Sequence, residues 1–227
     1  MTDIITSFID YLLHLDDHLF LMIQQYGFWI YAILFIIIFV ETGLVVMPLL
    51  PGDSLLFAAG TFCAGVINEA GEKAELNLVL VLLLLSVAAI AGDTLNYYFG
   101  KTIGLKVLTW QINGRHIVNQ KYIEQTQTFF HKHGSKTIII ARFVPIVRTF
   151  APFVAGIGNM RYATFIRYNV VGGLLWVFGL TLTGYFFGNL PFVQKNFELV
   201  IFGIIGVSLL PMIIEIIRVR GRRETVQ

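Results

Sequence analysis

The chain has 227 residues, of which 56% are hydrophobic and 13% are charged, and its mean hydropathy is +0.76. A soluble domain cannot bury that much apolar surface against itself, so the composition excludes an ordinary globular protein and indicates a membrane protein. The formal net charge is +2, and the single cysteine, Cys63, excludes an internal disulfide and a cysteine-based metal cluster. We interpret Cys63 as a small apolar side chain.

Residues 1–26 contain no lysine or arginine, so they lack the basic start of a signal peptide. Apolar residues recur there at helical spacing beside acidic ones, which predicts an amphipathic helix lying at the membrane interface. The acidic residues of this segment are Asp3, Asp10, Asp16 and Asp17.

The first long apolar stretch, at about 27–47, contains Glu41 and is closed by Pro48, Pro51 and Gly52. The next apolar stretch, 55–67, is shorter than the roughly 20 residues that a spanning helix needs. We therefore expect a re-entrant helical hairpin here, in which the prolines and glycine break the helix. The stretch 78–100 is long enough to cross the membrane.

A polar segment, 101–136, carries six lysines and arginines against one acid, Glu124. The apolar run that follows, 137–147, is broken by Pro145 and Arg148 and continues in a second arm, 149–158. This pattern predicts a second re-entrant hairpin. The stretches 168–188 and 199–217 are plausible full spans, and the chain ends in an arginine-rich tail.

The charges of the loops predict the orientation of the chain. By the positive-inside rule, the 101–136 segment, the turn containing Arg161 and Arg167, and the C-terminal tail are cytoplasmic, whereas the acidic loop 69–75 faces outward. The two hairpins then enter from opposite sides. The predicted fold is all-α and polytopic, with two inverted re-entrant hairpins, spanning helices and an N-terminal amphipathic helix.

The two halves also align with each other. Residues 48–60 fall beside 145–156, and residues 96–100 fall beside 184–188. Inverted repeats with broken helices are typical of transporters. We divide one membrane domain, 1–227, into an interfacial helix (1–26), a first repeat (27–100), a polar cytoplasmic segment (101–136), a second repeat (137–188), and a last span with its tail (189–227).

Charged residues inside the predicted hairpins are the candidate functional site. They are Glu41 and Asp53 in the first half and Arg142 and Arg148 in the second. Four unpaired charges at the bilayer centre would cost roughly 10–14 kcal/mol, so these residues must avoid lipid. Crossed hairpins would bring the two carboxylates toward the two guanidiniums.

This cluster has two interpretations. Two buried ion pairs would merely hold the hairpins together, although such pairs stabilise little. Alternatively, Arg142 and Arg148 bind an anion such as a lipid phosphate, and Glu41 and Asp53 exchange protons, because a partly dry site favours neutral carboxylates. Asp93, within the 78–100 stretch, is either a further proton-coupling residue or a residue near the interface.

Other motifs carry less weight. Gly100-x-x-x-Gly104 and Gly184-x-x-x-Gly188 permit close helix contacts or a homodimer. His131 and His133 have no third ligand nearby, so we predict no metal site, and nothing indicates a cofactor or a nucleic-acid partner. The motifs of intramembrane hydrolases are absent from the sequence, and we predict that the protein is not an enzyme.

Three segments resemble the bacterial DedA family of inner-membrane proteins, and the resemblance extends over nearly the whole chain. The segments are Glu41-Thr-Gly-Leu, Leu50-Pro-Gly-Asp-Ser54 and Ala141-Arg-Phe-Val-Pro-Ile-Val-Arg-Thr-Phe-Ala-Pro-Phe-Val-Ala-Gly156. The resemblance implies two opposed re-entrant hairpins, kinship with eukaryotic VTT-domain lipid scramblases, and essential acids and arginines that match Glu41, Asp53, Arg142 and Arg148.

The resemblance also implies a role in envelope homeostasis and cell division that depends on the proton motive force. Some relatives are implicated in recycling undecaprenyl phosphate or in moving phosphatidylethanolamine. Together with the charged cluster, this predicts a transporter or flippase of a lipid phosphate in the inner membrane. The alternatives are a small cation/proton antiporter with indirect effects on the envelope, and a structural scaffold.

Overall fold

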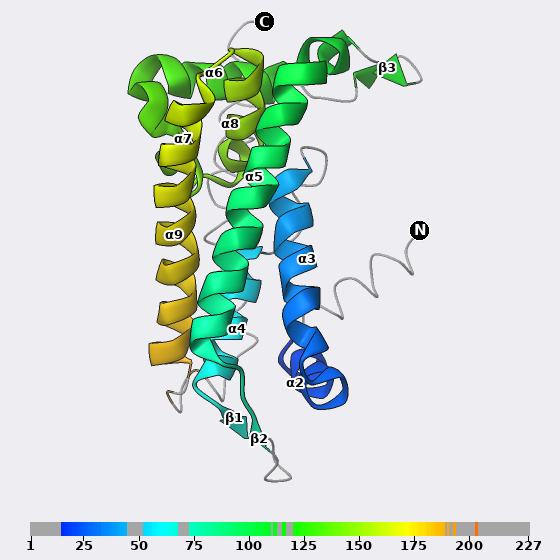
Figure 1. Ribbon diagram of the computed structural model, residues 1–227, viewed down its shortest axis with the longest axis vertical. Helices are drawn as coiled ribbons and strands as arrows, with labels where there is room; N and C mark the ends of the chain where they lie inside the picture. Colours follow the sequence, from blue (N-terminus) through cyan, green and yellow to red (C-terminus); the bar gives the residue numbers. More distant parts are fainter. Residues whose placement is uncertain are drawn as a thin grey trace, which may run out of the picture.

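The computed structural model describes residues 15–44, 52–67, 73–109, 111–112, 115–116 and 120–188, together with residues 190, 193 and 203. The described part is almost wholly helical, as the sequence predicts (Figure 1). Its helices are α2 (Leu15–Tyr26), α3 (Trp29–Gly43), α4 (Gly52–Cys63), α5 (Leu78–Thr109), α6 (Gln120–His133), the 3-10 helix η1 (Gly134–Lys136), α7 (Thr137–Ala141), α8 (Pro145–Ile157) and α9 (Tyr162–Phe187).

Two very short antiparallel β pairs accompany the helices. β1 (Val66–Ile67) pairs with β2 (Lys73–Ala74), and β3 (Gln111–Ile112) pairs with β4 (Arg115–His116). The first pair joins the end of α4 to the start of α5, and Val66 lies opposite Ala74. The predicted acidic loop 69–75 therefore belongs partly to a small hairpin.

Two long helices form the frame of the molecule. Residues 78–104 of α5 and the whole of α9 are long and apolar enough to cross a membrane. At 1.5 Å per residue, the 32 residues of α5 extend about 48 Å, which exceeds the roughly 30 Å of a hydrocarbon layer. Large apolar side chains on both helices point outward, among them Val79, Leu83, Leu174 and Leu175. Lipid is the solvent that suits such a surface.

The short helices α4 and α8 exchange partners between the two halves of the chain. Each packs mainly against the long helix of the other half, α4 against α9 and α8 against α5. In Figure 1, α4 lies beside the lower part of the frame and leads to β1, whereas α8 lies beside the upper part. The two short helices therefore start near the middle and run toward opposite ends, and α3 completes the bundle beside α5.

Glycine makes this packing between the two halves possible. A methyl group at Gly60 of α4 would overlap the carbonyl oxygen of Thr181 in α9, and one at Gly184 would overlap that of Phe57. The equivalent contacts in the other half join Gly156 to Tyr97 and Gly100 to Phe153. These close backbone approaches require residues without a side chain.

The two glycine contacts correct one detail of the sequence alignment. Gly100 and Gly184 occupy equivalent positions, because each packs against a phenylalanine carbonyl of the crossing helix. The alignment by sequence placed Gly100 beside Gly188, one helical turn away. Both predicted small-residue motifs thus serve contacts within the chain, and the homodimer stays a prediction that draws no support from them.

Part of the predicted organisation lies outside the described residues. This applies to residues 1–14 of the amphipathic helix, to Pro48 and Pro51, and to nearly all of the last span and tail at 189–227. Where the structure describes the predicted helices, it lengthens two of them. α5 continues past Gly100 to Thr109, and α9 begins at Tyr162 rather than Tyr168.

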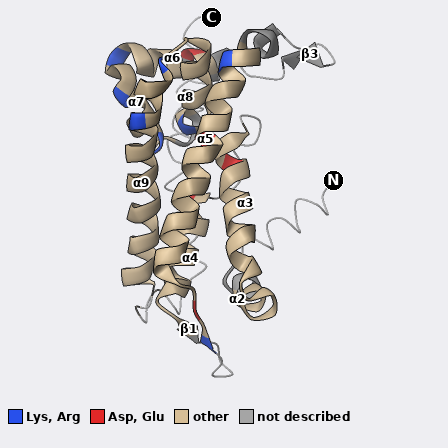
Figure 2. Ribbon diagram, viewed as in Figure 1, with Lys and Arg blue, Asp and Glu red and all other residues tan. Residues whose placement is uncertain are grey.

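Most described lysines and arginines gather at one end of the bundle. Figure 2 shows them around α6, α7 and the adjoining ends of α5 and α9. Lys101, Lys132, Lys136, Arg161 and Arg167 are exposed there. The middle of the bundle instead holds a few charged side chains that are largely buried, and these define the candidate site.

Candidate functional site

Three charged residues meet where the short helices begin. Glu41 lies in the last turn of α3, Asp53 in the first turn of α4, and Arg148 in the first turn of α8. Pro145 is the first residue of α8, a position where its missing N–H does no harm. The helix break therefore lies at residues 142–144, before Pro145, and Arg148 is helical rather than part of the break.

Arg148 binds both carboxylates. Its Nη2 lies 2.6 Å from Glu41 Oε1, and its Nη1 lies 2.6 Å from Asp53 Oδ1. The side chain of Glu41 is 2% exposed, that of Arg148 10% and that of Asp53 19%. The planar guanidinium thus joins α3, α4 and α8 at one point, and the first and second halves of the chain meet there.

Gly52 leaves room for the Glu41 carboxylate. A methyl group at Gly52 would overlap the oxygens of Glu41, so α4 must begin with a residue that has no side chain. The sequence predicted Gly52 as a helix breaker. The structure gives it a second role, because it lets the carboxylate reach Arg148 across the start of α4.

Trp176 of α9 completes this cluster. Its indole Nε1 donates a hydrogen bond of 2.8 Å to Asp53 Oδ1. The Arg148 Cζ lies 4.9 Å from the ring centroid, and the Arg142 Cζ lies 5.7 Å from it. Both distances suit a cation–π contact. Sequence reasoning did not single out Trp176, because an aromatic residue in an apolar span gives no charge signal.

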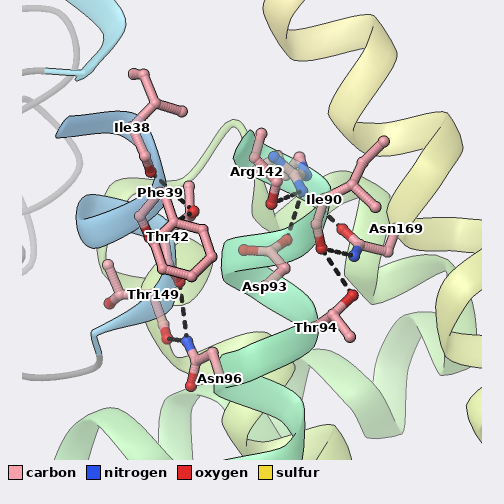
Figure 3. Close-up of polar contacts among 11 residues, drawn as sticks. Ile38, Phe39, Thr42, Ile90, Asp93, Thr94, Asn96, Arg142, Thr149 and Asn169 are labelled. Atoms are coloured by element: carbon pink, nitrogen blue, oxygen red, sulfur yellow. Dashed lines mark hydrogen bonds and ion pairs between the residues drawn. The ribbon is translucent and has the colours of Figure 1, made fainter. Parts of the chain in front are cut away.

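A second ion pair lies deeper, between α5, the break before α8, and α9. Arg142 Nη2 lies 2.5 Å from Asp93 Oδ2 and donates a hydrogen bond of 2.7 Å to Asn169 Oδ1 (Figure 3). Asn169 in turn donates to the carbonyl oxygen of Ile90. All three polar side chains are buried, and within the described part of the chain neither Arg142 Nε nor Nη1 has a hydrogen-bond partner.

Asn96 connects the two halves close to the first cluster. Its Nδ2 donates to the carbonyl oxygen of Thr42, at 3.3 Å, and to that of Thr149, at 2.9 Å (Figure 3). These carbonyls belong to the residues that directly follow Glu41 and Arg148 in the sequence. The fully buried Asn96 thereby holds the backbone next to both partners of an ion pair. A polar amide within an apolar span was the sequence signal that could have identified it.

The structure thus brings the predicted residues together but pairs them differently. The sequence predicted two carboxylates facing two guanidiniums, whereas both carboxylates contact Arg148 and Arg142 takes Asp93. Asp93 lies midway along α5 and is buried inside the bundle. Of the predicted helix breakers, Gly52 and Pro145 begin α4 and α8.

The fold and site are those of a helical membrane protein with polar groups inside its bundle. The features that define this class are two long apolar helices, two short helices that start at mid-bundle, and a cluster of largely buried charges between them.

Comparison with known proteins identifies the family. The VTT domain model matches residues 50–186. Protein DedA of Escherichia coli (strain K12) is 53% identical over 216 residues, which cover 95% of each chain. The chain therefore belongs to the DedA family of membrane proteins. An uncharacterized membrane protein of Mycobacterium tuberculosis (strain ATCC 25618 / H37Rv) is 41% identical over 85% of this chain and 81% of its own.

Another relative is the inner membrane protein YqjA of Escherichia coli (strain K12), which is 36% identical over 73% of this chain and 71% of its own. No solved structure matches the chain. The matched VTT segment contains Asp53, Asp93, Arg142, Arg148 and Trp176, whereas Glu41 lies before it.

Proposed function

We propose that this protein is a proton-linked transporter that moves the phosphate headgroup of a lipid across the bacterial inner membrane. Undecaprenyl phosphate and phosphatidylethanolamine are the candidate lipids, and envelope homeostasis and cell division are the processes served. No covalent chemistry is required, so the protein is not an enzyme. The observation that carries the proposal is a single guanidinium, that of Arg148, held by two carboxylates inside a membrane bundle.

The charges of the cluster support a link between anion and proton. Together the two clusters hold three carboxylates (Glu41, Asp53 and Asp93) and two guanidiniums (Arg142 and Arg148), so when fully ionised they carry 3 − 2 = 1 negative charge. In the proposed cycle, a phosphate that binds the Arg148 guanidinium displaces one of its two carboxylates. A displaced carboxylate in a dry site is stabilised by taking up a proton.

The backbone around Arg148 also favours an anion. Helices α4 and α8 both begin beside the cluster, and helix N-termini carry partial positive charge and unpaired N–H groups. Pro152, inside α8, offers no N–H to the carbonyl of Arg148, which loosens this turn. Broken helices whose N-termini face a substrate anion at mid-membrane are a known transporter arrangement.

The opposed directions of α4 and α8 suit access from alternate sides. We interpret each as the inner arm of a re-entrant hairpin, so that the cluster lies near the middle of the bilayer. The basic end of Figure 2 then faces the cytoplasm, as does the C-terminus, and the first 26 residues lie at the interface. A membrane potential would supply about 2.3 kcal/mol per 100 mV for each proton that crosses.

A second candidate function follows from the same charge balance. A cluster with one excess negative charge suits a cation as well as a proton, which favours a small cation/proton antiporter whose effects on the envelope are indirect. This function requires no lipid movement.

Leaflet exchange in proteoliposomes tests the proposal. Labelled undecaprenyl phosphate and labelled phosphatidylethanolamine are each followed with and without an imposed pH gradient, for the unaltered protein, Arg148→Ala and Glu41→Gln. We expect exchange of one lipid that the gradient accelerates and that both variants lose. If neither lipid moves while all three proteins remain folded, the lipid proposal fails, and cation flux in the same vesicles tests the antiporter.

A further inference from the structure

Trp176 occupies an unusual position in the bundle, because it contacts both charged clusters at once. One cluster is Glu41, Asp53 and Arg148, and the other is Asp93, Arg142 and Asn169. The indole contacts one guanidinium from each cluster.

The contacts on Trp176 are of two chemical kinds. The Nε1–H donates to Asp53 Oδ1 at 2.8 Å, which is a hydrogen bond to a charged acceptor. The ring face lies 4.9 Å from Arg148 Cζ and 5.7 Å from Arg142 Cζ. The side chain is only 2% exposed, so water does not screen these contacts. A cation–π contact is strongest where the cation has lost its water.

The surroundings fix the indole in this place. Trp176 lies on α9, one turn after Gly172 and Gly173, and the Arg142 side chain lies over these two glycines. Arg142 therefore reaches the indole along the surface of the same helix that carries it. If either guanidinium moves, its contact with the indole ring changes. A shift of the ring in turn changes the hydrogen bond from Nε1–H to Asp53.

We propose that Trp176 is a positioning residue that couples the two charged clusters. When a substrate displaces Arg148, the Asp93–Arg142 pair changes, and a change in that pair likewise shifts Arg148. The biological role of this coupling rests on the proposed transport function, whereas the stability test below does not require transport. In this role Trp176 transfers no proton and binds no substrate. It holds Arg148 against Glu41 and Asp53, and it transmits a displacement of Arg148 to the Asp93–Arg142 pair.

Additivity of stability changes tests the coupling without any transport. Asp53→Asn and Asp93→Asn are made singly and together, and the melting temperature of each purified protein is measured. Changes at sites that do not interact add, whereas coupled sites deviate from the sum. We expect the double variant to deviate from the sum of the single shifts by several degrees, and this deviation to vanish when Trp176→Leu is added.

Two further variants keep the test decisive. Trp176→Phe retains a ring face and removes only the N–H, so it should preserve part of the deviation even if Trp176→Leu does not fold. Trp29→Leu is the matched control, because Trp29 is 71% exposed on α3 and should leave the deviation unchanged. The coupling would be overturned if the melting-temperature shifts of Asp53→Asn and Asp93→Asn add in a chain that keeps Trp176. It would also be overturned if the deviation from additivity survives in both Trp176 variants.

A transport measurement gives the second readout. In the leaflet-exchange assay, we expect Trp176→Leu to raise the KM for the labelled lipid at least tenfold, because Arg148 is no longer held, and Trp176→Phe to recover most of that loss. If lipid moves but the stability shifts simply add, the coupling fails and the transport function stands. If no lipid moves but the deviation depends on Trp176, the coupling stands and the transport function fails.

Discussion

The two arginines of the buried site differ in how their surroundings are built. Arg148 contacts two carboxylates, one of them 19% exposed, and it lies where two short helices begin. Arg142 has one carboxylate and one amide, is fully enclosed, and lies against the two long helices. On the proposed function, the partly exposed Arg148 cluster exchanges partners during transport, whereas the enclosed Arg142 cluster holds the two long helices together.

The largest expected effect is on stability, at the enclosed pair. Arg142→Ala leaves Asp93 as an uncompensated buried charge, which should lower the free energy of unfolding by about 3–5 kcal/mol. Replacing both partners with apolar residues, Arg142→Met with Asp93→Leu, should recover most of this loss. Denaturant unfolding in detergent micelles measures both. A loss below about 1 kcal/mol for Arg142→Ala would remove the distinction between the clusters.

The next effect concerns the shared guanidinium. Arg148→Lys keeps the charge but loses the planar fork that reaches Glu41 and Asp53 together. Transport should fall at least tenfold, while the free energy of unfolding falls by about 1.5–3 kcal/mol, the contribution of one charge-assisted hydrogen bond. Leaflet exchange and unfolding of the same preparation give the two values. Unchanged transport would show that a single contact to Arg148 suffices.

Gly52→Ala tests the space in which Glu41 lies. The added methyl group would push the Glu41 carboxylate away from Arg148, and overpacking of this kind costs about 1–3 kcal/mol. Gly179→Ala is the matched control, because a methyl group there meets nothing within 4 Å. It should be neutral or stabilise α9 by about 0.5–1 kcal/mol. Equal melting temperatures for the two variants would contradict the close contact at Gly52.

The smallest expected effect is at the amide that joins the two halves. Asn96→Ala removes the hydrogen bonds to the carbonyls of Thr42 and Thr149, which should lower the free energy of unfolding by about 1 kcal/mol. Thr102→Val, an exposed change on the same helix, is the control. Leaflet exchange by Asn96→Ala should fall by more than this small loss of stability explains, because Asn96 holds the backbone beside Glu41 and Arg148.

The sequence predicted the helical class and the charged residues for a clear physical reason. Ionised side chains are costly in lipid, so Glu41, Asp53, Arg142 and Arg148 stand out in apolar stretches. The lengths of the stretches separated the short helices α4 and α8 from the long ones α5 and α9. The interpretation of α4 and α8 as re-entrant arms stays a prediction.

The pairing of the charges could not be predicted, because it depends on the crossing of helices from different halves. Nothing in the spacing shows that Asp93, rather than Glu41 or Asp53, faces Arg142. Trp176 was missed for a related reason, since its role comes from contacts with residues 28 and 34 positions earlier and with Asp53. Asn96 and Asn169 were detectable in principle, as polar amides within apolar spans.

The most direct test of the central claim replaces each cluster by neutral side chains and compares transport with folding. One variant carries Glu41→Gln, Asp53→Asn and Arg148→Gln, and the other carries Asp93→Leu with Arg142→Met. Leaflet exchange is measured for both in proteoliposomes, beside their unfolding. The first variant should fold and move no lipid, whereas the second should keep part of its exchange. Exchange at the unaltered rate by the first variant would contradict a transport role for the Arg148 cluster and leave it as a structural scaffold.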